Sequence, residues 1–487
     1  MGDTGIDLRT AARSAEGPNG ARPAGAGFID KDKLRSLAEA PAPGDSELDA
    51  ILRHADKLQG LGIEEVARLI RVQGQAQRDR ILETAMRVKE AIYGRRMVFF
   101  APLYVGNTCS NNCLYCGFRR DNKDLVRAVL GKDEIEAETR TLLREGHKRL
   151  LMLSGESATT PLDYFLEAIE TAYGVREGEH HVRRINVEIA PLSVSDFARL
   201  KATTIGTYVC FQETYDPDLY SVYHPSGPKR DYLNRLLVMD RAMEGGIEDV
   251  GIGALFGLGD WRFELLGLFE HARHLEEMYG CGPHTISVPR LQPAAGSAIA
   301  NHVPSPLTDE DFKLLVGVIR IAMPYTGIIL STRESEAMRN SLFTYGVSQI
   351  SAGSRTNPGA YAQEAGKHSS EAGSQFTLGD HRNLDEVVSS LVDSGHIPSF
   401  CTGCYRKGRV GQDFMDLAKP GLIKEFCMPN GLFTFQEYLL DFASPETKGK
   451  GQALLDRLVE GIGRSDLRER SRAALADIKA GKRDIYF

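Results

Sequence analysis

The sequence contains no run of 18 or more apolar residues, so no segment is long enough to cross a membrane as a helix. It has no excess of basic residues either: the net charge is −7 and the pI ≈ 6.0, which argues against a nucleic-acid-binding surface. The segment from Met1 to about Ala26 lacks the apolar core of a secretory signal, and we expect a disordered tail there. With 42% hydrophobic and 26% charged residues, the composition is that of a soluble globular protein.

Cysteine is also scarce, yet its distribution is informative. Six of the eight cysteines fall into two clusters. Disulfide scaffolds are typical of small secreted domains, and a chain of 487 residues without a secretory signal does not fit that class. We therefore expect thiols that bind metal in a reducing compartment, the cytoplasm. The clusters are Cys109, Cys113 and Cys116, and Cys401, Cys404 and Cys427.

Short β-rich runs alternate with amphipathic helical segments from Met97 to about residue 356. Eight such runs, each followed by a helix, predict an α/β fold of the (β/α)8 TIM-barrel type. A chain of this length is too long for one small core, so further units are expected beside the barrel. The runs cover residues 98–105, 149–154, 185–190, 207–212, 250–256, 285–291, 327–332 and 347–352.

Two further regions flank the barrel, to which we assign residues 97–356. Residues 1–44 are expected to be a disordered tail and lead-in, and residues 45–96 read as N-terminal helices. Residues 357–376 are rich in small and polar residues, which suggests a long loop across the barrel. The whole of 357–487 is expected to form a mostly helical C-terminal domain that holds the second cysteine cluster.

The first cluster has the spacing Cys109-x3-Cys113-x2-Cys116 and follows the first predicted strand. Three thiolates can hold three corners of a cubane iron–sulfur cluster. No fourth cysteine follows nearby, so one iron would stay open for a small molecule, as a catalytic metal site requires. A zinc site or buried free thiols are the alternatives, although zinc sites usually use two separated pairs of cysteines.

Polar residues recur just past the ends of the predicted strands. The carboxyl ends of the strands in a parallel barrel surround one mouth, where active sites lie. We therefore expect these residues to line a common site. They are Cys109, Gly155, Glu156, Glu188, Glu213, Gly257, Arg290, Arg333 and Ser354.

The spacing of the first cluster, the aromatic Tyr115 before its last cysteine and the predicted barrel behind it resemble the radical S-adenosylmethionine (SAM) superfamily. This resemblance implies a 4Fe–4S cluster whose open iron binds the methionine part of SAM. It also implies that one electron from the cluster cleaves SAM to a 5′-deoxyadenosyl radical, which requires a cluster of low potential.

Three further segments resemble SAM-binding motifs of this superfamily. Gly155 and Glu156 resemble the motif that holds the methionine ammonium, although a helix-capping glutamate would look the same. Glu188 is expected to point into the barrel, where an unpaired carboxylate is costly unless a ribose or an ammonium group compensates it. Gly253 lies on a strand that resembles the glycine-rich, adenine-contacting strand, and a glycine that packs a strand against a helix explains it equally well.

The second cluster combines Cys401 and Cys404 with the more distant Cys427. It again supplies three thiolates, which leaves a position for substrate or another metal. Basic residues nearby would offset the negative charge of a cluster. A zinc site completed by a histidine such as His396 is the alternative. The basic residues are Arg406, Lys407 and Arg409.

Both clusters together resemble the HydG family, the tyrosine lyases that mature the active-site cluster of FeFe hydrogenases. The resemblance covers about residues 45–487, including 186–192, 211–215, 282–290, 330–334 and 351–355. It implies cleavage of the Cα–Cβ bond of L-tyrosine to p-cresol and dehydroglycine, and conversion of dehydroglycine to carbon monoxide and cyanide at an auxiliary 4Fe–4S cluster with an extra iron. It also implies an electron donor such as flavodoxin or ferredoxin, and other hydrogenase maturation proteins as partners.

The substrate carboxylate needs a fixed cation, for which an arginine is best suited. Arg333 is the first candidate and Arg290 the second, while either can instead pair with Glu334 or Glu188 as part of the scaffold. In the family a histidine holds the extra iron, and His284 is the candidate here.

Two alternatives remain open. The 2-iminoacetate synthases of thiamine biosynthesis share the barrel motifs and lack the second three-cysteine cluster, which would then be structural here. A non-catalytic iron–sulfur scaffold or carrier is the other alternative, although such a protein needs no buried charged pocket.

Overall fold

The computed structural model describes residues 26–363, 373–419 and 421–487. The disordered tail expected over the first residues, and part of the loop expected at 357–376, lie outside these ranges. Within them, none of the helices is both long and apolar enough to traverse a lipid bilayer.

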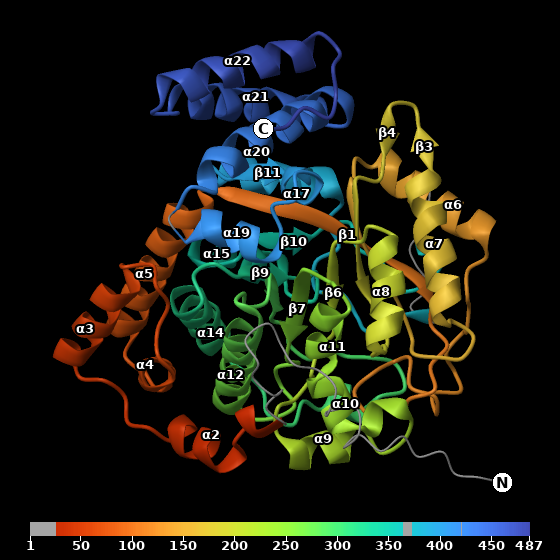
Figure 1. Ribbon diagram of the computed structural model, residues 1–487, viewed down its shortest axis with the longest axis vertical. Helices are drawn as coiled ribbons and strands as arrows, with labels where there is room; N and C mark the ends of the chain where they lie inside the picture. Colours follow the sequence, from red (N-terminus) through yellow and green to blue (C-terminus); the bar gives the residue numbers. More distant parts are fainter. Residues whose placement is uncertain (1–25, 364–372, 420) are drawn as a thin grey trace.

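A closed barrel of parallel strands forms the centre of the molecule (Figure 1). Among the described residues, eight strands follow each other around the barrel, and the last pairs with the first through Val98 opposite Gln349. This confirms the predicted (β/α)8 fold. The strands are β1 (Arg96–Gly106), β2 (Arg149–Ser154), β5 (Arg184–Glu188), β6 (Thr207–Val209), β7 (Asp249–Gly253), β8 (Thr285–Ser287), β9 (Gly327–Leu330) and β10 (Gln349–Ser351).

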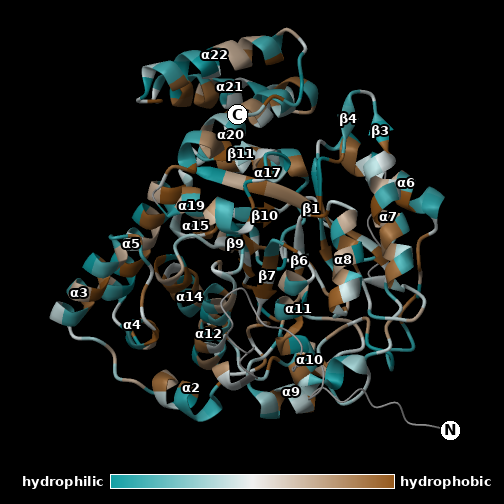
Figure 2. Ribbon diagram, viewed as in Figure 1, coloured by the Kyte–Doolittle hydropathy of each residue, from teal (hydrophilic) through white to brown (hydrophobic). Residues whose placement is uncertain are grey.

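Helices cover the outside of the barrel, and their apolar faces pack against the strands; Figure 2 shows brown, hydrophobic segments around β7 at the centre. Several strands are shorter than expected, because the chain leaves the ladder early to form the loops of the mouth. Residues 232–244 form two short helices separated by Leu237. The outer helices are α6 (Lys132–Arg144), α7 (Leu162–Gly174), α8 (Val194–Ala202), α10 (Tyr232–Leu236), α11 (Val238–Glu244), α12 (Trp261–Tyr279), α14 (Asp309–Ala322), α15 (Glu336–Tyr345) and α17 (Leu384–Asp393).

The N-terminal helices begin earlier than the expected boundary at residue 45. Helix α2 (Lys31–Ala38) starts at Asp30, whose carboxylate accepts hydrogen bonds from the backbone N–H groups of Asp32 and Lys33. An ion pair of 2.9 Å between Arg35 and Asp216 then holds α2 to the barrel loops. The remaining helices of this region are α3 (Asp45–Ala55), α4 (Ile63–Leu69) and α5 (Gln75–Tyr93).

A strand that the sequence analysis did not predict, β11 (Ile397–Ser399), pairs in parallel with the first residues of β1. It leads directly to Cys401 and so places the second cysteine cluster at the amino end of the barrel strands. The C-terminal helices pack beyond it, at the top of Figure 1. They are α18 (Gly403–Arg406), α19 (Gly411–Ala418), α20 (Lys424–Asp441), α21 (Pro445–Glu460) and α22 (Ser465–Lys479).

A buried ion pair joins these C-terminal helices to the barrel. Arg183 lies 2.8 Å from Glu437 of α20, and the two side chains are only 2% and 4% exposed. Lys148 is buried beside them; burial, together with repulsion from Arg183, lowers its pKa to about 7, while Glu437 acts in the opposite direction. Glu437 is therefore the anion on which two buried cations depend.

We expect Glu437→Ala to destabilise the protein by about 2–3 kcal/mol, because it leaves Arg183 with only the more exposed Asp484, 3.1 Å away, as an ionic partner. The matched control is Arg87→Ala, which breaks an exposed pair with Asp56 and should cost at most about 1 kcal/mol. Tm values measured by scanning calorimetry would compare the two variants. An equal, small decrease in both would contradict a structural role for the buried pair.

Candidate active site

The loop that carries the first three cysteines follows β1 and is fixed by backbone hydrogen bonds to other loops at the barrel mouth. The N–H of Ser110 donates to the carbonyl of Glu156 (2.7 Å), and the N–H of Leu114 donates to the carbonyl of Tyr223 (3.0 Å). Glycine is required at position 155 because a Cβ there would lie 2.2 Å from the carbonyl oxygen of Thr108. The loops therefore hold the cysteine backbone in a fixed position.

The three thiols of this loop form a donor set that a metal cluster could use. Burial raises the pKa of Cys113 to about 12 and that of Cys116 to about 11, so metal binding would have to displace the protons. Soft thiolate ligands suit an iron–sulfur cluster, and three of them can hold three corners of a cubane.

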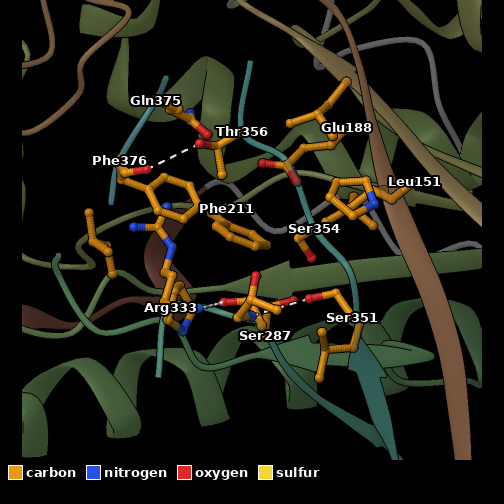
Figure 3. Close-up of a pocket in the computed structure, with 18 of the residues that line it drawn as sticks. Leu151, Glu188, Phe211, Ser287, Arg333, Ser351, Ser354, Thr356, Gln375 and Phe376 are labelled. Carbon is orange, nitrogen blue, oxygen red and sulfur yellow. Dashed lines mark hydrogen bonds between the residues drawn. The ribbon is translucent and has the colours of Figure 1, made fainter. Parts of the chain in front are cut away.

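A cavity extends from this loop into the barrel, and Figure 3 shows many of the side chains that line it. Its walls come from the carboxyl halves of the strands and from the segment after residue 373. Of the predicted mouth residues, Glu188, Glu213, Arg333 and Ser354 line it, and so does Cys116 of the first cysteine cluster. Residues that the sequence analysis did not select also line it: Tyr104, Asn186, Phe211, Ser287, Ser331, Thr356, Gln375 and Phe376.

Arg333 is a half-buried cation in this cavity. Its guanidinium carbon lies 3.3 Å from the ring centroid of Phe376, so the aromatic ring covers one face (Figure 3). None of the carboxylates in the described part of the chain forms an ion pair with it. Burial lowers its pKa, although Glu213 and Glu188 act in the opposite direction. The free edge of the guanidinium can therefore bind an anion.

Two carboxylates of the cavity differ in their electrostatics. Burial, followed by repulsion from Glu213, raises the pKa of Glu188 to about 7. Burial also acts on Glu213, but Lys229, whose Nζ donates to it at 2.6 Å, and Arg235 hold its pKa below the usual range. No cation in the described part of the chain forms an ion pair with Glu188, although Lys229, Arg235 and Arg333 partly offset the rise in its pKa. Glu188 can therefore accept a positively charged or hydrogen-bonding ligand.

Glu156 lies at the mouth of the barrel, beside the cysteine loop, but does not line this cavity. Its carboxylate accepts hydrogen bonds from Arg235 (2.8 Å) and Asn111 (2.7 Å). Burial would raise its pKa, but Arg235 and Lys229 keep it below the usual value. Binding of the methionine ammonium at Gly155 and Glu156 stays a prediction.

Two other expected site residues also belong to the scaffold. The Nε of Arg290 donates to Glu334 at 3.0 Å and its Nη1 donates to Asp309 at 2.7 Å, which confirms the scaffold alternative for this arginine. A Cβ at Gly253 would lie 2.8 Å from the ring of Phe211, so the protein itself fills the space left by this glycine. Neither Arg290 nor Gly253 lines the cavity.

The second cysteine cluster lies in another cavity, at the amino ends of the strands. Cys401, Cys404 and Cys427 line it together with His284, as predicted. His396 does not line it; its ring instead lies 2.9 Å from the hydroxyl of Ser394, which disfavours the zinc alternative with this histidine. The remaining lining includes Tyr93, Arg96, Arg149, Gly327, Gln349, Tyr405, Phe414 and Asn430.

Cations balance the second set of thiols. A hydrogen bond with Cys404 stabilises the thiolate of Cys427 and lowers its pKa, and Arg96 and Arg409 act in the same direction. Arg96 and Arg409 therefore offset the negative charge of this thiolate. Arg409 is one of the basic residues predicted for this role, whereas Arg96 is not. Arg406 instead pairs with Asp484. The low pKa of Cys427 favours metal binding at this thiol, because less free energy is needed to remove its proton. Burial raises the pKa of Cys401, and the hydrogen bond with Cys427 raises that of Cys404.

Sequence reasoning could have found some of the missed residues. Tyr104 and Asn186 occupy alternate, inward-facing positions of predicted strands. Gln375 and Phe376 gave no such indication, because they follow a segment without periodicity and reach the cavity only through the path of that segment. Tyr405 follows a predicted cysteine ligand, but nothing in the pattern indicates that it contacts the barrel.

The chain matches two family models. Residues 103–270 match the radical SAM superfamily. Residues 287–397 match the biotin and thiamin synthesis associated domain. The second match ends before Cys401, so neither model includes the second cysteine cluster.

Curated relatives match the larger part of the chain. It is 32% identical over 323 residues to a 2-iminoacetate synthase from Salmonella typhimurium, covering 65% of this chain and 81% of the relative. The 2-iminoacetate synthase from Escherichia coli is 31% identical over 325 residues, covering 66% and 81%.

Two solved structures cover almost the whole chain. A crystal structure of HydG, described as a maturase of the [FeFe]-hydrogenase, is 43% identical with a TM-score of 0.90, covering 94% of this chain and 100% of that one. The HydG structure from Carboxydothermus hydrogenoformans is 40% identical with a TM-score of 0.78, covering 92% and 99%. The unmatched part of the chain is shorter than the segment after residue 397. The similarity to HydG therefore extends into that segment, which contains the second cysteine cluster. The chain belongs to the HydG family of the radical SAM superfamily.

Proposed function

We propose that the protein is a radical SAM lyase that cleaves the Cα–Cβ bond of L-tyrosine to p-cresol and dehydroglycine. We further propose that its second site converts dehydroglycine to carbon monoxide and cyanide for the active-site cluster of an FeFe hydrogenase. One observation carries this proposal: a single barrel has a three-cysteine site at each end, and the cavity at one end contains an unpaired arginine. The likeness to HydG maturases supports it.

At the first site, Cys109, Cys113 and Cys116 would hold a 4Fe–4S cluster. With SAM bound, this cluster would supply a 5′-deoxyadenosyl radical that removes a hydrogen atom from the substrate. The protein itself has to bind and orient tyrosine. Arg333 would bind the carboxylate, while Phe376 keeps the guanidinium in place.

Glu188 would compensate a positive or hydrogen-bonding group of the bound ligands, either the ammonium of an amino acid or a ribose hydroxyl. Its carboxylate has no cationic partner of its own and lies in the same cavity as Arg333. If Arg333 binds the carboxylate of tyrosine and Glu188 its ammonium group, the two contacts fix the orientation of the substrate. The bond to be cleaved then takes one position in the cavity. The largely buried cavity also keeps water away from a reactive intermediate.

At the second site, Cys401, Cys404 and Cys427 would hold the auxiliary 4Fe–4S cluster, and His284 the extra iron. Bound there, these groups would supply open iron positions that capture carbon monoxide and cyanide. The contribution of the protein is electrostatic: Arg96, Arg149 and Arg409 lie around the thiols and offset their charge. Gln349 lines both cavities, so the two sites adjoin at this residue of β10.

The alternative within the same enzyme class is 2-iminoacetate synthesis, supported by relatives of that name. An assay with tyrosine distinguishes the two functions, because p-cresol and glyoxylate without carbon monoxide or cyanide would support the synthase. A non-catalytic iron–sulfur carrier is disfavoured by the charged groups of the first cavity. We expect a cytoplasmic protein that receives electrons from a flavodoxin or ferredoxin and acts with other hydrogenase maturation proteins.

Arg333→Lys should raise the KM for tyrosine by about tenfold or more, because lysine keeps the charge but loses the planar fork that binds a carboxylate. The matched control is Arg290→Lys, in which the altered cation pairs with Glu334 and should leave KM nearly unchanged. Initial rates of p-cresol formation at varied tyrosine concentration measure both variants. An increase in KM confined to Arg290→Lys would reverse the assignment.

The raised pKa of Glu188, about 7, predicts a pH dependence. Below this pH the carboxyl group becomes protonated and no longer balances a positive charge, so KM for tyrosine should increase as the pH falls from about 8 to about 6. Glu188→Gln is neutral at every pH, and its KM should be high throughout, without this increase. The same steep profile in both proteins would show that another group titrates.

Anaerobic iron and sulfide counting on Cys401→Ala tests the division between the two sites. The variant should lose about half of its iron and keep SAM-dependent formation of 5′-deoxyadenosine, because the first cysteine loop is unchanged. Cys281→Ala, which removes a buried thiol outside both cavities, should keep all of its iron. Full iron content in Cys401→Ala would contradict a second cluster on these cysteines.

A further inference from the structure

Tyr405 reaches from the second cysteine cluster to the floor of the barrel. It follows Cys404 in the short helix α18, and its ring lies 3.3 Å from the guanidinium carbon of Arg184 in β5. Its hydroxyl lies 3.0 Å from Arg149 Nη2 and 3.1 Å from His284 Nε2. One side chain of the cluster region therefore contacts several barrel strands and the candidate iron ligand.

The hydrogen-bonding roles at this hydroxyl follow from chemistry. An arginine can only donate, so the oxygen of Tyr405 accepts the hydrogen bond from Arg149. The phenol proton is thereby free to be donated, and the nearest acceptor is Nε2 of His284. A ring nitrogen that accepts this proton carries the lone pair of the imidazole, so the lone pair lies at Nε2.

The other ring nitrogen of His284 supports this assignment. With the lone pair at Nε2, Nδ1 carries the proton, and it faces Oδ1 of Asp249 at 3.5 Å. A carboxylate behind the N–H of a histidine is the usual arrangement for a histidine that binds a metal through its other nitrogen. Tyr405 lines the second cavity and Asp249 does not, so the nitrogen on the cavity side is Nε2.

We propose that the hydroxyl of Tyr405 is a placeholder for iron on His284: it donates to Nε2 while this position is empty and competes with a ferrous ion for the lone pair. The proposal rests on the proposed function of the second site. Tyr405 is thus a positioning residue, which keeps the ring of His284 oriented before iron arrives. Asp249 faces the other ring nitrogen at 3.5 Å without a hydrogen bond and favours a proton there through its charge.

The placeholder can leave at little cost. When a metal takes the lone pair, the phenol proton can turn towards the hydroxyl of Thr207, 3.4 Å away, while the oxygen still accepts from Arg149. The ring keeps its stacking on Arg184, because this contact does not involve the hydroxyl. Iron therefore competes with one neutral hydrogen bond for the lone pair of His284. The free energy of such a bond corresponds to a roughly threefold to tenfold change in iron affinity.

Ferrous iron binding to the full-length protein tests this proposal without an activity measurement. Tyr405→Phe, Asp249→Asn and wild type are reconstituted with both clusters, desalted and dialysed anaerobically against increasing concentrations of Fe²⁺. Bound iron in excess of the clusters gives the dissociation constant. The matched control is Tyr164→Phe, which removes a hydroxyl that donates to the backbone carbonyls of Val105 and Leu130, outside the second cavity.

Tyr405→Phe should bind the extra iron roughly threefold to tenfold more tightly than wild type, and Tyr164→Phe should equal wild type. Asp249→Asn should bind it about 10-fold to 100-fold more weakly, because the orienting carboxylate is lost. Unchanged or weaker binding in Tyr405→Phe would overturn the placeholder, and unchanged binding in Asp249→Asn would overturn the deduced tautomer. Wild type that binds no extra iron would contradict both this inference and the proposed second site, while p-cresol formation would still test the first site.

Discussion

Hydrogen bonding between strand β1 and three other strands determines where both cysteine clusters lie. Its first residues pair with β11, its middle pairs with β10 and its last residues pair with β2. The pairing with β10 closes the barrel, and β1 leads at its carboxyl end into the loop of Cys109. At its amino end, β11 leads into Cys401. One long strand thus separates two metal-binding loops by the height of the barrel, although they lie far apart in the sequence.

Buried charge gives each end of the barrel its chemical character. At the carboxyl end, most acids already have a cation: Glu156 pairs with Arg235, and Glu213 with Lys229. This leaves Arg333 and the poorly compensated Glu188 for ligands. At the amino end of the barrel strands, several arginines surround three thiols, so positive charge predominates there. Charges of this kind are costly to bury without partners, so each imbalance indicates the charge of the group that belongs there.

The sequence was sufficient to predict the barrel and the two cysteine triads, because strand alternation and close cysteine spacing are local patterns. It was also sufficient for the proximity of His284 to the second triad, through the family resemblance. It could not distinguish Arg333 from Arg290: both follow a strand, and only the fold reveals that Glu334 engages the latter. Likewise the pattern around Glu156 and Gly253 was correct, but Arg235 and Phe211 fill the positions that were assigned to ligands, and these contacts are long-range.

Under the proposed function, the same geometry would keep apart two chemistries that interfere in a single pocket. Radical formation would need a cavity in which the substrate is held by opposite charges, whereas capture of small carbon fragments would need open metal positions near cationic groups. The two cysteine loops lie at opposite ends of the barrel strands, and their cavities adjoin at Gln349, whose amide oxygen lies 3.5 Å from Nη1 of Arg149. A fragment that moves through the barrel from the first site to the second would therefore have to pass this polar contact.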